Sequence, residues 1–132
     1  MWAPPPLQPV PVWWGGAGPA ALRRAARNDG WLGLPLDRAA AAPVLQTLRD
    51  ERLAAGLPLA GFAVNIALTE THDKAAVREV EDMGVTGLMI MSPWLPNPFF
   101  SAPWFDPKAN PSLLETKRAA MLRFAEQVIH RN

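Results

Sequence analysis

The sequence predicts an α/β domain built on a parallel β-sheet. Four short apolar stretches alternate along the chain with segments in which apolar residues recur at helical spacing, and glycine, proline or capping residues stand between them. One strand and one helix together take about 30 residues, so four such units fill the 132 residues. Strands that alternate with helices in this way form parallel sheets with right-handed crossovers.

Composition narrows the class of protein. The chain is 49% hydrophobic and 19% charged, which is typical of a folded globular domain. Its 13 basic and 12 acidic residues leave a net charge of +1, too little for the broad positive surface that nucleic acid requires. Without cysteine the chain has no disulfide and no thiolate nucleophile, which fits a reducing compartment. No apolar run approaches the roughly 20 residues of a membrane span. We therefore expect a cytoplasmic protein that binds neither nucleic acid nor membrane.

The first part of the chain contains two strand candidates and one helix candidate. Residues 1–10 are rich in proline and are expected to form an extended lead ahead of a domain over 11–132. A strand is expected over 11–14, then a glycine-rich turn, then a helix over 19–27 whose first residue is a proline. A second strand is expected over 31–34.

The middle of the chain repeats the pattern. Asp37 is the expected N-cap of a second helix, which Gly56 ends. Residues 62–68 (FAVNIAL) are short and almost continuously apolar, which is typical of a strand covered on both faces. Thr71 or Asp73 is the expected cap of a third helix.

The last unit carries a long loop. A fourth strand is expected over 87–91, and a final helix over 112–131, where Ser112 and Glu115 have the spacing of a capping box. The intervening loop, 92–111, holds six prolines and several large aromatic residues. Long loops in compact domains usually have a functional reason, so this one is a candidate wall of a binding site.

The candidate cofactor-binding residues are Gly15, Gly16, Ala17 and Gly18. Such a turn lets backbone N–H groups approach an anion, and the positive end of the following helix dipole adds to the attraction. A tight turn that needs glycine only for its φ angles has the same sequence. From the spacing alone both interpretations stay open. Arg23 and Arg24, one to two helical turns further on, either reach that anion or remain solvated.

The candidate substrate-pocket residues are Asn65 and Trp94. Asn65 is polar inside a buried strand, so it faces a cofactor or bonds a neighbour. Trp94 follows the fourth strand, and the aromatic residues beyond it either bind a flat ring, form the core of the loop or leave an apolar surface. Those aromatic residues are Phe99, Phe100, Trp104 and Phe105.

Catalytic residues cannot be assigned. Glu70, Thr71 and His72 follow the third strand, and His72 is either a general acid or base or an exposed polar residue. His130 is expected to compensate a helix dipole. Two histidines 58 positions apart, without an acidic partner motif, predict no metal site and no hydrolytic triad.

Four motifs occur in order over most of the chain: PVPVWWGGAG, then ALRRAAR, then DGW, then GVTGLMIMSPW. Together they resemble the C-terminal half of the bacterial luciferase-like monooxygenases. That family consists of (β/α)₈ oxidoreductases that use FMN or the deazaflavin coenzyme F-420. The resemblance implies the C-terminal (βα)₄ half of a TIM barrel, with the cofactor phosphate held by Gly15 to Gly18. It places Trp31 at the bottom of the barrel, where residues serve stability.

The resemblance also implies what such a half lacks. The first four βα units of the family have no counterpart in the sequence, so we expect pairing with an N-terminal half or a second copy. The implied function is an oxidoreductase module that binds a flavin-type cofactor and a small-molecule substrate. The alternatives are a non-catalytic half-barrel that dimerises or binds an anion, and a nonfunctional gene fragment.

Overall fold

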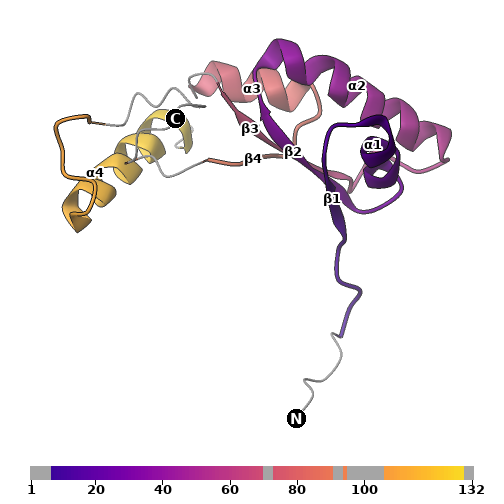
Figure 1. The fold of residues 1–132 in the computed structure, drawn as a ribbon, viewed down its shortest axis with the longest axis horizontal. Coiled ribbons are helices and arrows are strands. Elements are labelled where there is room, and N and C mark those ends of the chain that lie inside the picture. The colour runs from indigo at the N-terminus through magenta and orange to yellow at the C-terminus, as the bar shows by residue number, and fades with distance from the viewer. Residues whose placement is uncertain (1–6, 70–72, 91–93, 95–105, 130–132) are drawn as a thin grey trace.

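A computed structural model describes residues 7–69, 73–90, 94 and 106–129 of the chain (Figure 1). Four parallel strands form one sheet, and they lie side by side in the order in which they occur along the chain. The strands are β1 (Trp13–Gly15), β2 (Gly30–Leu36), β3 (Ala63–Leu68) and β4 (Gly87–Leu88). The predicted α/β class with a parallel sheet is confirmed.

The strand boundaries differ from the predictions by two or more residues at three places. β1 begins at Trp13, two residues later than expected. β2 continues to Leu36 through a proline, because its register against β3 shifts between Leu32 and Pro35. Such a shift is a position where a strand tolerates proline. β4 ends at Leu88, so the prediction of a strand that runs beyond it through Ile90 is wrong.

Helices α1 (Pro19–Ala26), α2 (Arg38–Ala54) and α3 (Lys74–Asp82) lie along one side of the sheet (Figure 1). Successive right-handed crossovers between neighbouring strands leave every helix on the same face, whereas a reversal of strand order would put helices on both. Val64, Ile66 and Leu68 point toward the helices and are buried against them. The face away from α1–α3, here called the open face, carries alternate residues of the same strands.

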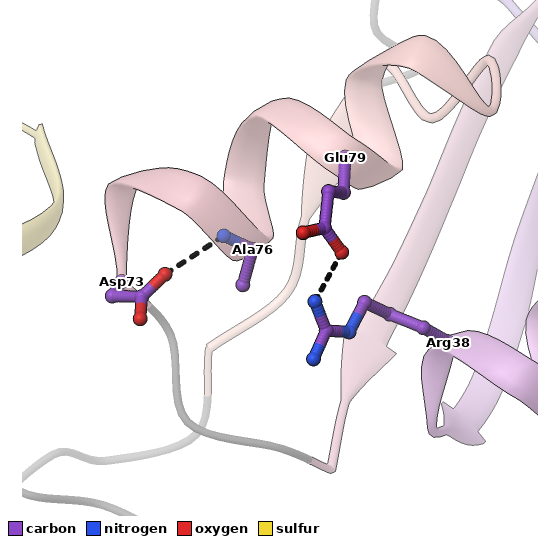
Figure 2. A network of polar contacts seen from close by, with 4 residues as sticks. All are labelled: Arg38, Asp73, Ala76 and Glu79. Atoms are coloured by element: carbon purple, nitrogen blue, oxygen red, sulfur yellow. Dashed lines mark hydrogen bonds and ion pairs between the residues drawn. The ribbon is translucent and has the colours of Figure 1, made fainter.

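Two of the predicted helix caps are confirmed. Asp37 accepts a hydrogen bond from the backbone N–H of Ala40 at 2.7 Å and starts α2. Asp73 accepts from the N–H of Ala76 at 2.7 Å and starts α3, as Figure 2 shows. Asp73 is therefore the cap of α3, and Thr71 lies outside the described residues.

An ion pair joins the helices that these caps begin. Arg38, the first residue of α2, donates to the carboxylate of Glu79 on α3 (Figure 2). The two side chains are 37% and 58% exposed, so water screens the pair and it adds at most about 1 kcal/mol to stability. It ties α2 to α3 near the carboxyl ends of the strands that precede them.

The C-terminal helix α4 (Leu114–Phe124) continues into a π-helical turn over Ala125–Ile129. The predicted capping box is wrong, because Leu113 is the N-cap and no side chain caps the helix. The backbone N–H of Ser112 instead donates to Asn110 Oδ1 at 2.9 Å. Ala120 is the buried residue of α4, so this helix is anchored far less firmly than α1, α2 or α3.

The core lies between the sheet and α1–α3. Its largest fully buried side chains are Trp31, Leu48, Ile66, Leu68 and Val80. On the open face, by contrast, Trp13, Leu32 and Leu34 are 48%, 42% and 49% exposed. One face of the sheet is therefore packed like a protein interior, while the other presents large apolar side chains to water.

Within the described ranges, every helix is too short or too polar to cross a lipid bilayer.

Candidate functional site

The glycine turn joins the end of β1 to the start of α1. Gly18 is the N-cap, with extended backbone at φ −71° and ψ 154°, and its carbonyl accepts from the N–H groups of Ala21 and Leu22 at 2.9 and 3.0 Å. No side chain caps this helix, and its first turn contains no acidic residue. Neither a side-chain cap nor an acidic residue of its own first turn therefore offsets the positive end of the α1 dipole.

Three backbone donors near this end have no acceptor within the part of the chain that the structure describes. They are the N–H groups of Ala17, Gly18 and Ala20, and Pro19 between them has none to satisfy. Free N–H groups at a helix N-terminus are the arrangement that binds phosphate and other anions. The turn that the sequence singled out therefore has the donors that such binding needs.

The two glycines of the turn differ in their tolerance of a side chain. Gly16 has φ +99°, and a Cβ placed on it would lie 3.1 Å from the Cβ of Ala21, so glycine is required there by its conformation. A Cβ on Gly18 would meet nothing within 4 Å. The space beside Gly18 is thus open to a bound group or to an introduced side chain.

Trp31, a residue of the core, forms a hydrogen bond with the turn. Its indole Nε1–H donates to the carbonyl of Gly16 at 2.8 Å, although the two residues lie on different elements. Trp31 is fully buried, as a structural role requires, but this contact lies at the carboxyl end of β1, whereas the resemblance placed Trp31 at the opposite, bottom end. The contact with Gly16 was not predicted, because it depends on how β1 and β2 are paired.

The arginines of α1 lie along the helix that follows the turn. The guanidinium of Arg24 lies over the ring of Trp14, with Cζ 4.6 Å from the ring centroid. Arg23, Arg24 and Arg27 line an open hollow of about 290 Å³, together with Ala20 near the start of the helix. Trp14 Nε1 is buried without a hydrogen-bond partner among the described residues. Arg24 is therefore held against β1 by a cation–π contact.

Asn65 lies on the open face beside β4. It pairs in register with Leu32 on β2 and Gly87 on β4, and a Cβ on Gly87 would overlap Asn65 Oδ1. Gly15, Leu32, Asn65 and Gly87 thus form one level across the four strands, level with the carboxyl end of β1. Gly15 and Gly87 have no side chain, so Asn65 is the polar residue of this level.

Trp94 has a different neighbour. The ammonium of Lys117 on α4 lies over its ring, with Nζ 5.9 Å from the centroid. Among the described residues, Trp94 and Asn65 thus have different neighbours. The other candidates for catalysis or binding lie outside the described residues: Glu70, Thr71, His72, Ser92, Pro93, Phe99, Phe100, Trp104, Phe105 and His130.

A cavity of about 340 Å³ lies at the opposite end of the sheet. It is lined by Leu45 and Arg49 of α2, by Phe62 just before β3 and by Thr86 just before β4. Residues that precede parallel strands lie at the amino ends of those strands, away from the glycine turn. This cavity is therefore separate from the candidate cofactor site.

Arg52 is a buried charged residue that the sequence interpretation did not single out. It is 7% exposed, and its guanidinium donates to the carbonyls of Ala26, Asn28 and Pro58 at 3.0, 2.8 and 2.6 Å. Helical spacing could have predicted this burial, since Arg52 follows Leu45 and Leu48 on the buried stripe of α2. No cluster of three metal-ligating side chains occurs within the described ranges.

The relatives that comparisons with known proteins identify are uncharacterized proteins. The chain is 36% identical over 132 residues to uncharacterized proteins of Mycobacterium bovis and Mycobacterium tuberculosis. The match covers 96% of this chain but spans only 40% of the length of those relatives. No family model and no solved structure matches the chain.

Proposed function

We propose that this domain is an oxidoreductase module that binds the phosphate of FMN or of coenzyme F-420 at the turn Gly15 to Gly18. The observation that carries the proposal is the set of N–H groups on Ala17, Gly18 and Ala20, which have no acceptor among the described residues and lie at a helix N-terminus without a side-chain cap. The residues present fit the phosphate end of such a cofactor, because Gly18 leaves open space beside these donors. The luciferase-like resemblance supplies the identity of the cofactor.

We propose further that the domain is the C-terminal (βα)₄ half of a TIM barrel. Consecutive strand order with all of α1–α3 on one face is the arrangement of half such a barrel. The open face is then the barrel interior, where Trp13, Leu32 and Leu34 need a cover. Four further βα units cover this face and pair the free edges of β1 and β4 at once. The relatives carry three-fifths of their length outside the matched segment, which is room for such units.

In this arrangement the cofactor supplies the electron or hydride chemistry, and the protein holds and orients it. The turn is at the carboxyl end of β1, the end of the sheet at which active sites of (β/α)₈ enzymes form. Asn65, on the same level of the open face, places an amide where it hydrogen-bonds a small-molecule substrate or the cofactor ring. We place the protein in the cytoplasm, because a chain without cysteine suits a reducing compartment.

A non-catalytic half-barrel that dimerises or binds an anion is the second candidate. The exposed apolar residues of the open face favour it, because a second copy covers them as well as a different half does. The two candidate functions predict different ligand selectivity. A catalytic module distinguishes FMN from inorganic phosphate, whereas a simple anion site binds both through the same oxygen atoms.

A matched pair of variants tests the phosphate site. Gly18→Asp and Gly18→Asn have the same shape and both cap α1, since Gly18 has N-cap geometry and room for a side chain. Only the aspartate adds a negative charge beside the free N–H groups. We expect FMN or coenzyme F-420 to bind at least about tenfold more weakly to Gly18→Asp than to Gly18→Asn. Equal affinities in a fluorescence titration contradict the assignment.

A further inference from the structure

We infer that Trp31 is a positioning residue for the Gly15–Gly18 turn and that Gly33 keeps the space its ring requires. The buried indole lies within the core, yet its Nε1–H reaches the carbonyl of Gly16 at 2.8 Å, beyond the end of β1. This contact joins the core directly to the turn that carries the free backbone donors.

Gly33 explains how a side chain near the start of β2 reaches so far. A Cβ on Gly33 would lie 2.5 Å from Trp31 Cη2 and 2.6 Å from Cζ3, closer than any real Cβ approaches a neighbour. The six-membered part of the indole therefore lies against Gly33, two residues further along the strand. The ring leans toward the carboxyl end of the sheet, and a larger residue at 33 would push it away from that position.

The hydrogen bond also determines where the next backbone donor points. The carbonyl of Gly16 and the N–H of Ala17 belong to one peptide unit, and the described chain has no cis peptide bond. In a trans peptide these two groups point in opposite directions. Because Trp31 holds the Gly16 carbonyl toward the core, the Ala17 N–H points away from the core. It is one of the donors without an acceptor.

The consequence for binding rests on the proposed function. If the turn holds a cofactor phosphate, Trp31 arranges a donor for it in advance, without touching the ligand. Loss of the indole N–H then weakens binding because the peptide can rotate, and a fivefold to tenfold loss corresponds to about one hydrogen bond. The arrangement of the turn itself is a property of the unbound protein and is measurable without ligand.

The experiment compares Trp31→Phe with Leu48→Ala in the full chain. Phe keeps an aromatic ring at 31 but has no N–H, while Leu48 is a fully buried residue of α2 whose loss lowers stability at a distance from the turn. Amide NMR without ligand is expected to show new chemical shifts and faster motion at Gly16, Ala17 and Gly18 in Trp31→Phe, and native values in Leu48→Ala. Gly33→Ala is expected to reproduce the Trp31→Phe changes, because it displaces the same ring.

The outcomes separate this inference from the proposed function. Native shifts and native mobility of the turn in Trp31→Phe and in Gly33→Ala overturn the inference, whatever the wild type binds. A loosened turn in both variants, together with a wild type that binds neither FMN nor coenzyme F-420, supports the inference and contradicts the proposed function. A loosened turn and a fivefold to tenfold loss of FMN affinity in both Trp31→Phe and Gly33→Ala, with Leu48→Ala unchanged, support both.

Discussion

The guanidinium of Arg52 on α2 lies over the ring of Phe62, with Cζ 4.3 Å from the ring centroid. Three backbone carbonyls accept hydrogen bonds from the same guanidinium, and they come from the end of α1, the turn before β2 and the loop before β3. One buried side chain thus connects the segments at the amino ends of β2 and β3. Its charge is balanced by carbonyl dipoles and an aromatic face.

We predict that Arg52→Leu lowers the free energy of unfolding by about 2–4 kcal/mol, because it leaves one buried and two partly buried carbonyls without this donor. Arg49→Leu is the control, since Arg49 is on the same helix and exposed, and a change within about 0.5 kcal/mol is expected there. Urea denaturation followed by circular dichroism measures both. Equal stability of the two variants contradicts the role of Arg52.

The cap of α3 and the ion pair beside it are predicted to differ in strength. Asp73→Ala removes the acceptor of the Ala76 N–H and should cost about 1 kcal/mol. Glu79→Gln removes one charge of the exposed pair with Arg38 and should cost less, about 0–0.5 kcal/mol. Thermal denaturation distinguishes them, and a larger loss from Glu79→Gln would show that the ion pair dominates.

Asn65 and Gly87 are predicted to be energetically coupled. Gly87→Ala destabilises the protein because its methyl group overlaps Asn65 Oδ1, and Asn65→Ala removes that obstacle. A double-mutant cycle in urea should therefore give an interaction energy of about 1 kcal/mol or more, with the double variant more stable than the sum of the single effects predicts. Additive effects would mean that Asn65 does not rest against β4.

The open face is predicted to be a contact surface. Leu32→Glu and Leu34→Glu leave the stability of the isolated chain within about 0.5 kcal/mol, because both side chains are already nearly half exposed. They are expected to abolish self-association, or association with a complementary half. Leu53→Glu, at an exposed position of α2, is the control and should associate as the wild type does. Light scattering after size-exclusion chromatography measures the oligomeric state of each variant. A wild type that stays monomeric at high concentration contradicts the prediction of self-association.

Local signals predicted much of the fold, and competing local contacts together with long-range pairings account for what they missed. Asp37 and Asp73 cap helices as expected, because an N-cap depends on residues within one turn of itself. Ser112 does not cap α4, although its spacing to Glu115 is an equally local pattern. The side chain of Asn110 accepts the hydrogen bond of the Ser112 N–H that the capping box would use. Sequence spacing alone does not distinguish these cases.

The sequence predicted which residues form the candidate site, but not the contacts that hold them in place. The glycine turn was recognisable because a strand, glycines and a helix follow one another directly. The brace from Trp31 depends on the register of β1 against β2 and on the empty space at Gly33, neither of which a linear motif expresses. Asn65 was recognised as a polar residue in an apolar strand, but its partner on β4 follows only from the strand order.

The central claim is that the turn between β1 and α1 binds a cofactor phosphate. A titration of the ¹⁵N-labelled chain with FMN, and in parallel with riboflavin, tests it most directly, because the two ligands share the ring and differ in the phosphate. We expect FMN, and not riboflavin, to shift the amide signals of Ala17, Gly18 and Ala20 in a saturable way. The same titration with coenzyme F-420 extends the test to the deazaflavin. If neither phosphate-bearing cofactor moves these three signals at millimolar concentration, the claim is contradicted.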